Sequence, residues 1–234
     1  MKVVILAGGY GTRIAEETAE KPKPMVLING QPLIWHLMGI YASQGFDDFV
    51  IAGGYKVEII HEWVEKIEES WKVQVLDTGQ DTQTGGRIKR CAENFSDEVF
   101  LATYGDGLAN VHFAKLLKQH AESDAILTLT AVRPPARFGY LKLNGSKVID
   151  FGEKNQSDEG WINGGFFVMD RRILGYIPDD IQPFEVRALP DLAKDGLLAA
   201  YAHDGFWQPM DTLREKLELE KYASQTPPPW MIQT

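Results

Sequence analysis

A glycine-rich segment with one arginine follows the first apolar run of the chain. The segment LAGGYGTR, residues 6–13, comes directly after Val3, Val4 and Ile5. Glycine allows a tight turn and lets backbone N–H groups approach a ligand, and successive N–H groups after a strand form an anion-binding concavity. Arg13 adds a permanent positive charge that suits phosphate. The segment therefore predicts a phosphate-binding loop, although an ordinary glycine turn with a surface arginine explains the glycines equally well.

The loop differs from the two common nucleotide-binding motifs, and a lysine lies a short distance beyond it. No Lys-Ser or Lys-Thr pair follows at P-loop spacing, and GGYGTR lacks the GxGxxG spacing. Lys23 lies within EKPKPMVLINGQP, where three prolines keep the backbone extended. A rigid segment of this kind can present Lys23 to the same anion. The alternative is a solvated lysine.

Two aspartates far apart in the chain are candidates for a metal site. Asp106, in YGDG, follows the apolar run 99–103, so its carboxylate is predicted at the end of a strand. Asp211 lies in WQPMDT. Two carboxylates together with phosphate oxygens and water are the ligands that Mg²⁺ prefers. The alternatives are a turn-forming residue for Asp106 and a helix N-terminal residue for Asp211.

The order of the predicted elements explains how these residues could meet. In the first half, strands alternate with helices, and glycines stand at the strand exits, which is typical of an open, mostly parallel α/β sheet. Ligands bind at the carboxyl ends of the strands in such sheets. The second half is richer in strands, and no linker separates the halves. Strands are predicted at 3–7, 48–52, 72–76, 99–103, 125–132, 139–143, 147–151 and 163–169, and helices at 33–41, 60–71, 186–195 and 212–223.

Composition limits the classes of partner. The 234 residues carry a formal net charge of −9 without a long basic block, which argues against a protein that binds long nucleic acids. Cys91 is the only cysteine, so no internal disulfide forms, and this fits a reducing compartment. No segment approaches the roughly 18 apolar residues of a membrane span, and the N-terminus lacks a signal peptide. A cytoplasmic protein without a nucleic-acid or membrane partner is therefore predicted.

Taken together, LAGGYGTR and KPKPM resemble the signature of the sugar-1-phosphate nucleotidylyltransferase family. The resemblance covers nearly the whole chain and implies one domain, 1–234, of the nucleotide-diphospho-sugar transferase type: a Rossmann-like, mostly parallel sheet flanked by helices, with a β-rich sugar-binding elaboration. Residues 1–124 would mainly bind the nucleotide, and residues 125–234 the sugar phosphate and the second metal carboxylate. The further matching segments are TGGRIKR (84–90), YGDG (104–107), RFGYL (137–141), EK (153–154), INGGFFV (162–168) and GFWQPMDT (205–212).

The resemblance implies a Mg²⁺-dependent nucleotidyl transfer, in which a sugar-1-phosphate oxygen attacks the α-phosphorus of a nucleoside triphosphate and pyrophosphate leaves. The implied catalytic residues are Arg13, Lys23 and Asp106, and the implied metal ligands are Asp106 and Asp211. The implied nucleotide-binding residues are Leu6, Ala7, Gly8, Gly9, Gly11, Thr12, Arg13, Thr84, Gly85, Gly86, Tyr104 and Gly105.

The TGGR segment resembles the CTP-using branch of the family, which implies CTP and α-D-glucose-1-phosphate as substrates and CDP-glucose as product. The alternative for this segment is an ordinary helix N-terminus with Thr84 as its cap and Arg87, Lys89 and Arg90 on a solvated face. Use of UTP or dTTP, a different phosphate or phosphonate acceptor, and a non-catalytic nucleotide-sugar-binding regulatory protein also stay open. A homo-oligomer is expected by resemblance. The implied sugar-phosphate-binding residues are Gly139, Tyr140, Glu153, Lys154, Asn163 and Gly164.

Overall fold

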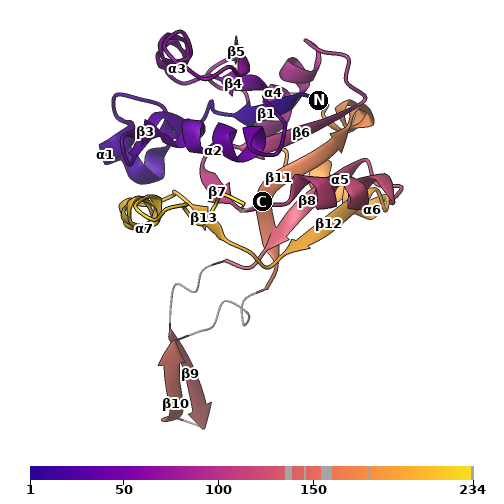
Figure 1. Ribbon diagram of the computed structural model, residues 1–234. Helices are drawn as coiled ribbons and strands as arrows, with labels where there is room; N and C mark the ends of the chain where they lie inside the picture. Colours follow the sequence, from indigo (N-terminus) through magenta and orange to yellow (C-terminus); the bar gives the residue numbers. More distant parts are fainter. Residues whose placement is uncertain (135–138, 145, 154–159, 179, 233–234) are drawn as a thin grey trace.

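A seven-stranded sheet forms the centre of the molecule (Figure 1). The computed structural model describes residues 1–134, 139–144, 146–153, 160–178 and 180–232. The strand order is β12-β8-β11-β6-β1-β4-β5. Only β11 runs antiparallel to its neighbours, β6 and β8, and the other adjacent pairs are parallel, so the predicted mostly parallel sheet is confirmed. The bounds are β1 Val3–Leu6, β4 Asp48–Gly53, β5 Lys72–Asp77, β6 Val99–Tyr104, β8 Leu127–Val132, β11 Ile162–Asp170 and β12 Leu198–His203.

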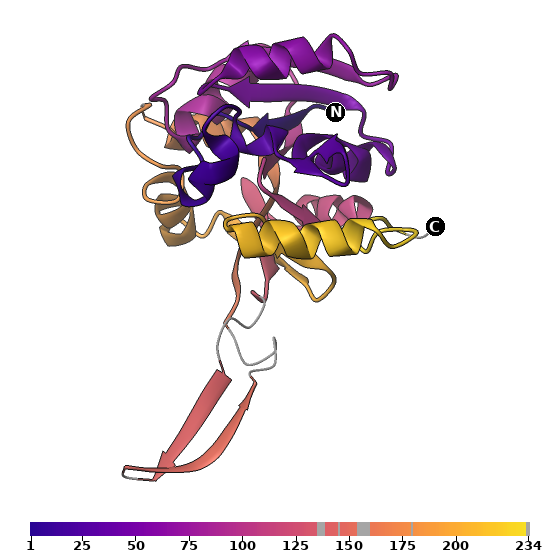
Figure 2. The same ribbon diagram turned by 90° about the vertical axis from the view of Figure 1, so that its left-hand side faces the viewer.

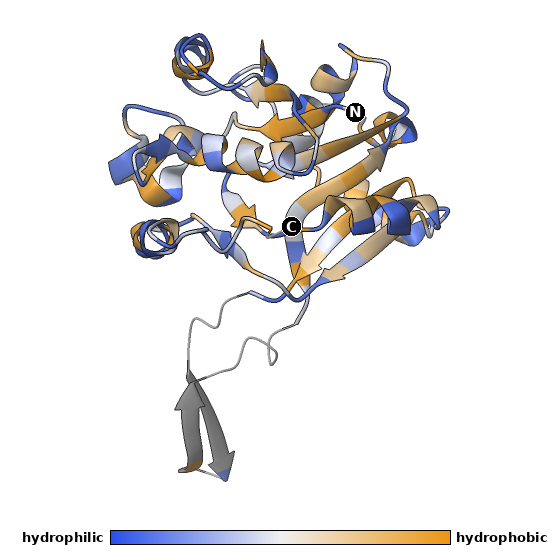
Figure 3. Ribbon diagram, viewed as in Figure 1, coloured by the Kyte–Doolittle hydropathy of each residue, from blue (hydrophilic) through white to orange (hydrophobic). Residues whose placement is uncertain are grey.

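Helices cover both faces of this sheet. Val3 and Ile5 of β1 face one apolar core, to which α2, α5 and α7 contribute, whereas Val4 and Leu6 face a second core with α4 and α6. A strand buried on both faces reads as a continuous apolar run, as the start of the chain does. Figure 3 shows the same concentration of hydrophobic residues in the central strands. The helices are α1 Ala15–Thr18, α2 Leu33–Ala42, α3 Val57–Val64, α4 Thr84–Ala92, α5 Phe113–Ala121, α6 Ala188–Lys194 and α7 Leu213–Ala223, with 3-10 turns at Thr12–Ile14, Lys23–Met25 and Arg171–Tyr176.

A small antiparallel ribbon joins two distant parts of the chain. It pairs β7, Gly107–Ala109, with β13, Trp207–Pro209, so that Pro209 lies opposite Gly107. The N–H of Met210 donates to the carbonyl of Asp106 at 2.8 Å. The ribbon therefore brings the segment before α7 to the carboxyl end of β6. Figure 1 labels this ribbon and α7 after it, and Figure 2 shows α7, in yellow, lying across the body.

Two further pairs of strands lie outside the main sheet. β2, Leu27–Ile28, pairs with β3, Gln31–Pro32, after the lysine-bearing segment. β9, Gly139–Asn144, and β10, Lys147–Glu153, form an antiparallel hairpin that makes its own two-stranded sheet. Within the described ranges, no helix combines the length and the apolarity that crossing a membrane requires.

The sequence-based elements differ from the structure in two ways. The helix predicted to reach Trp71 ends at Val64, and the Trp71 ring instead packs edge-on against Phe49 at 5.9 Å, just before β5. Helix α5 and strand β12 were not predicted, and neither was the ribbon of β7 and β13. The short strands carry too few residues for a periodic pattern, because their pairing is set by the fold around them.

Candidate active site

The glycine-rich loop leaves β1 and turns sharply into a 3-10 helix. Gly11 has a φ of +65°, which side chains other than glycine rarely adopt. A Cβ atom at this position would also lie 2.8 Å from Cγ2 of Thr18. The Thr18 hydroxyl donates to the Gly11 carbonyl at 3.0 Å and holds the turn closed. Gly11 is therefore required for the loop to carry Arg13 back over the carboxyl edge of the sheet.

The two predicted metal carboxylates converge on one ammonium group. Nζ of Lys23 lies 2.7 Å from Oδ2 of Asp106 and 2.7 Å from Oδ1 of Asp211. Arg13 contributes a further ion pair, with Nη1 2.5 Å from Oδ2 of Asp211. Because both aspartate oxygens contact the same nitrogen, they lie within twice 2.7 Å of each other. Two carboxylates and two cations thus form one neutral cluster.

Burial and charge act in opposite directions on Lys23. Its side chain is 12% exposed, and burial by itself would lower the pKa of the ammonium group. The ion pairs with Asp106 and Asp211 outweigh that effect, so the pKa of Lys23 is raised. The lysine is therefore fully charged at neutral pH. The guanidinium of Arg13 is 74% exposed and remains accessible to a ligand.

A helix cap positions Asp211. Thr212 is the N-cap of α7 and forms a capping box with Glu215. The Glu215 carboxylate also accepts a hydrogen bond from the backbone N–H of Asp211 at 2.7 Å. Asp211 therefore precedes the cap rather than starting the helix. The spacing T-x-x-E is visible in the sequence and could have identified Glu215 as a supporting residue.

The carboxylate pair has the chemistry of a Mg²⁺ site with few protein ligands. Its oxygens are hard donors that already hold a single cationic group between them. Among the residues that the structure describes, no group of three or more His, Cys, Asp or Glu side chains is placed to hold a metal ion. A divalent cation bound here would therefore complete its coordination with ligand oxygens and water. Asp106 and Asp211 therefore fit Mg²⁺, provided that a bound ligand and water supply the remaining coordinating oxygens.

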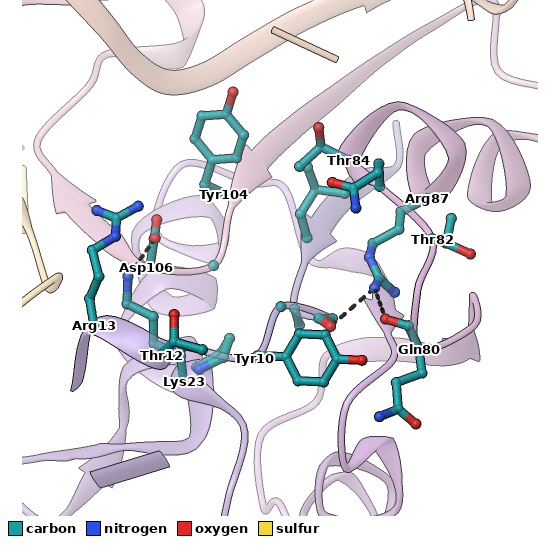
Figure 4. Close-up of a pocket in the computed structure, with 18 of the residues that line it drawn as sticks. Tyr10, Thr12, Arg13, Lys23, Gln80, Thr82, Thr84, Arg87, Tyr104 and Asp106 are labelled. Carbon is teal, nitrogen blue, oxygen red and sulfur yellow. Dashed lines mark hydrogen bonds and ion pairs between the residues drawn. The ribbon is translucent and has the colours of Figure 1, made fainter. Parts of the chain in front are cut away.

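A cavity of about 400 Å³ extends from this cluster along the carboxyl edge of the sheet. Figure 4 shows Arg13, Lys23 and Asp106 at one end, and Gln80, Thr82 and Arg87 at the other. The charged end suits a phosphate chain, and the polar opposite end has room for a base. The sequence-predicted residues in its lining are Leu6, Ala7, Gly8, Gly9, Gly11, Thr12, Arg13, Lys23, Thr84, Tyr104, Gly105, Asp106 and Asp211.

Gly85 and Gly86, which the sequence predicts at the base, lie outside the lining of this cavity. A Cβ atom at Gly86 would be 2.3 Å from Oδ1 of Asp180, and one at Gly85 would be 3.3 Å from Ile177. Both glycines therefore allow α4 to pack closely against the segment around residue 180. Thr84, at the start of α4, and Arg87, one turn later, are the parts of TGGR that reach the cavity.

Arg87 is a buried cation, so the solvated face considered for it is wrong. The residue is 4% exposed, and its guanidinium donates to the carbonyls of Gly8, Gly53 and Gln80 at 2.8–3.1 Å and to the Thr78 hydroxyl at 2.7 Å. A Cβ atom at Gly8 would lie 2.1 Å from this group. Burial lowers the pKa of Arg87, although nearby Asp77 opposes the effect. Arg87 therefore ties the glycine-rich loop to the base end of the cavity.

The predicted sugar-phosphate residues fall into three groups. Asn163 and Gly164, on β11, line a small second cavity of about 40 Å³ that Tyr104 and Asp106 share with the main one. Gly139, Tyr140 and Glu153 belong to the β9–β10 hairpin, in which Glu153 pairs with Gly139. Lys154 lies outside the described residues. Of the predicted sugar-phosphate residues, only Asn163 and Gly164 are therefore shown to lie beside the carboxylates, because they line a cavity together with Asp106.

Three other polar residues at or next to the cavity were not among the predicted site residues. Tyr10 donates to Oδ1 of Asp81 at 2.9 Å and closes one side of the base end. Glu185 accepts hydrogen bonds from the hydroxyls of Thr84 and Tyr104. Glu185 lies in the connection before α6, far along the chain from the residues that it contacts. No local pattern marks it.

Comparison with known proteins agrees with this geometry. Residues 2–214 match the nucleotidyl transferase family. The chain is 43% identical over 253 aligned residues to the glucose-1-phosphate cytidylyltransferase of Salmonella typhimurium, with 98% of each chain covered. It is 40% identical to the probable glucose-1-phosphate cytidylyltransferase of Bacillus subtilis, with 99% of this chain and 100% of the relative covered.

Solved structures share the fold. The crystal structure of HddC from Yersinia pseudotuberculosis complexed with GMP-PN has a TM-score of 0.76 and 26% identity, covering 94% of this chain and 98% of that one. A UDP-glucose pyrophosphorylase complexed with UDP-glucose is 17% identical with a TM-score of 0.72 over 94% and 97% of the two chains, which shows the fold alone. Because the family model matches residues 2–214 and the relatives align over almost the whole chain, the chain belongs to the nucleotidyl transferase family.

Proposed function

We propose that the protein transfers the cytidylyl group of CTP to α-D-glucose-1-phosphate, giving CDP-glucose and pyrophosphate. The observation that carries the proposal is the convergence of Asp106 and Asp211 on Lys23 at the charged end of an open cavity. The names of the relatives that align over almost the whole chain support the choice of CTP and glucose-1-phosphate. Alternation of parallel strands and helices in this fold also puts ligands at that edge.

The reaction needs positioning and charge compensation rather than a protein nucleophile. A phosphate oxygen of the sugar-1-phosphate attacks the α-phosphorus of CTP, a new P–O bond forms, and the bond to the pyrophosphate oxygen breaks. Arg13, 74% exposed at the cavity, binds the triphosphate. Backbone N–H groups of Gly8, Gly9 and Gly11 can cradle the phosphate chain. These groups hold the α-phosphorus in line with the attacking oxygen.

Lys23 has two sets of partners in this scheme. In the protein alone its ammonium neutralises Asp106 and Asp211. We propose that these two carboxylates would hold Mg²⁺ together with the phosphates of CTP, where the ion would offset charge on the α-phosphate and the leaving group. Lys23 then moves to the phosphate oxygens, which replace the carboxylates as its counter-ions. Loss of one such preorganised charge costs on the order of 100-fold in rate.

The base end of the cavity provides the polar groups for reading cytosine. Gln80, Asp81, Thr82, Gln83 and Thr84 line it consecutively. A carboxylate or amide oxygen there can accept from the 4-amino group of cytosine, whereas uracil and thymine present an oxygen at that position. The side-chain amides of the same set can also donate to the oxygen of uracil or thymine. The experiment must therefore distinguish CTP from UTP and dTTP.

A substrate panel tests the proposal. The protein is incubated with each of five nucleoside triphosphates and with several sugar-1-phosphates in the presence of Mg²⁺, and released pyrophosphate is measured. We expect the highest rate with CTP and α-D-glucose-1-phosphate. A higher rate with UTP or dTTP contradicts the base assignment, and nucleotide binding without pyrophosphate release favours a regulatory protein.

We also propose that residues 1–124 mainly serve the nucleotide and residues 125–234 mainly the sugar phosphate. Thirteen residues that the sequence assigns to the site line the main cavity, and Asp211 is the one among them that comes from the second half. The β11 wall with Asn163 and Gly164 stands on the acceptor side. The cytoplasmic location and the homo-oligomer stay predictions from the sequence.

A further inference from the structure

One carboxylate outside the lining of either cavity contacts residues of both. Glu185 lies in the connection between β11 and α6, and its two oxygens accept from different hydroxyls. Oε2 accepts from Thr84 Oγ1 at 3.0 Å, and Thr84 lines the base end of the main cavity. Oε1 accepts from the Tyr104 hydroxyl, and Tyr104 lies in the walls of both cavities. Glu185 thus joins the base side to the acceptor side.

The direction of each hydrogen bond in this network is fixed. A tyrosine hydroxyl has one hydrogen, which Tyr104 gives to Glu185. Its oxygen accepts from Nδ2 of Asn163 at 3.1 Å, while Oδ1 of Asn163 accepts from the backbone N–H of Gly165 at 3.0 Å. The bonds therefore run in one sense from Asn163 through Tyr104 to Glu185. Because the two hydroxyls contact different oxygens of Glu185, the carboxylate accepts from both, whereas an amide in the same position would turn an NH₂ group toward one of them.

Packing around the Tyr104 ring leaves it one position. Gly165 has a φ of +80°, and a Cβ atom there would lie 2.3 Å from Cδ2 of Tyr104. On the other side the ring meets Phe167 edge-on, with 5.4 Å between centroids. The ring lies in the walls of both cavities, and Figure 4 shows it beside the main one.

The start of helix α4 is held by the same segment. Thr84 Oγ1 accepts from the backbone N–H of Phe184 at 2.8 Å while it donates to Glu185. A shift of Glu185 would therefore take the acceptor from the Thr84 hydroxyl at the base end and from the Tyr104 hydroxyl on the acceptor side together. Among the hydrogen bonds of the described residues, Glu185 is the acceptor to which each of these two hydroxyls donates.

We propose that Glu185 is a positioning residue that couples the two substrate sites, so that the acceptor site depends on a hydroxyl at the base end. The inference rests on the proposed function, because it takes the main cavity for the nucleotide and the β11 wall at the smaller cavity for part of the sugar-phosphate site. Glu185 contacts neither substrate. It acts through Thr84 and Tyr104.

The test measures KM for the sugar phosphate in variants of Glu185 and of Thr84, which lies at the base end of the main cavity. Glu185→Gln keeps the shape but offers only one oxygen, so one of the two hydroxyls loses its acceptor. We expect its KM for the sugar phosphate to rise about 10-fold, with a smaller change in kcat, as for loss of one charged hydrogen bond. Thr84→Val, at the base end, should also raise that KM, by about fivefold. Glu185→Asp should restore part of the loss.

Coupling has a signature that a local structural role lacks. In a double variant of Thr84→Val and Glu185→Gln, KM for the sugar phosphate should equal that of Glu185→Gln alone. Asp191→Asn serves as the matched control, because it breaks an exposed ion pair between Asp191 of α6 and Arg187 just before that helix. It should change neither the KM for CTP nor the KM for the sugar phosphate. If Glu185→Gln does not fold, Tyr104→Phe replaces it in the same cycle.

The outcomes separate this inference from the proposed function. An unchanged KM for the sugar phosphate in Thr84→Val, or effects that simply multiply in the double variant, overturns the coupling while wild-type turnover upholds the function. Absence of pyrophosphate release by the wild-type protein counts against the function itself. In that case the affinity for glucose-1-phosphate, measured by calorimetry in the same variants, still decides the coupling.

Discussion

Replacing Lys23 with methionine should improve metal binding by the protein alone. The ammonium group lies 2.7 Å from a carboxylate oxygen of both Asp106 and Asp211 and fills the position between them. A divalent cation must displace it and break both ion pairs. Because Asp106 is 39% exposed, solvent weakens its pair, and the two together are worth about 2 kcal/mol. Removing this competitor should therefore tighten binding by about 30-fold.

Titration calorimetry with Mn²⁺ in the absence of nucleotide measures this effect. Mn²⁺ is chosen because it takes the same oxygen ligands as Mg²⁺. Lys2→Met is the matched control, since it removes an ion pair of the same 2.7 Å length, with Asp48, away from the cavity. Turnover of Lys23→Met should fall on the order of 100-fold even as Mn²⁺ binds more tightly. An unchanged or weaker Mn²⁺ affinity in Lys23→Met would refute the reasoning.

Three further predictions concern the site and the core. Asp106→Asn and Asp211→Asn should each lower kcat at least 100-fold without loss of circular dichroism, and near-normal turnover removes that residue from the metal site. Arg87→Met should lower the free energy of unfolding by about 3 kcal/mol in urea titrations, because buried acceptors lose their donor; a change below about 0.5 kcal/mol contradicts this. Burial raises the pKa of Cys91 to about 12. The stability that the neutral thiol contributes is complete below about pH 8.5, which is the pKa of a cysteine in the unfolded chain. It is lost as the pH rises toward 12. The free energy of unfolding of Cys91→Ala should therefore fall less than that of the wild-type protein over that range.

The sequence predicts the parts of the site that are encoded locally. The run that forms β1 and the glycines after it define the phosphate loop, and the positive φ of Gly11 follows from that turn. Asp106 was placed correctly, since it follows an apolar strand. Lys23 lines the cavity, as predicted, although Lys23–Met25 form a 3-10 turn and not the extended backbone that the prolines suggest.

Long-range contacts decide what the sequence left open. Nothing near Asp211 indicates that β13 pairs with β7, yet this ribbon brings its carboxylate to Lys23. Arg87 follows two glycines at the start of a helix, and from the sequence alone it could equally have faced solvent. Its burial depends on carbonyls from two loops and from the end of β4, which only the folded sheet brings together.

Crystals grown with Mn²⁺ and a non-hydrolysable analogue of CTP test the central claim most directly. The anomalous signal of manganese locates the ion without assumption about its ligands. We predict one peak bound by Asp106 and Asp211, with Nζ of Lys23 on a phosphate oxygen and the cytosine beside residues 80–84. A metal peak away from these two aspartates, or Lys23 still between them with the nucleotide bound, contradicts the account.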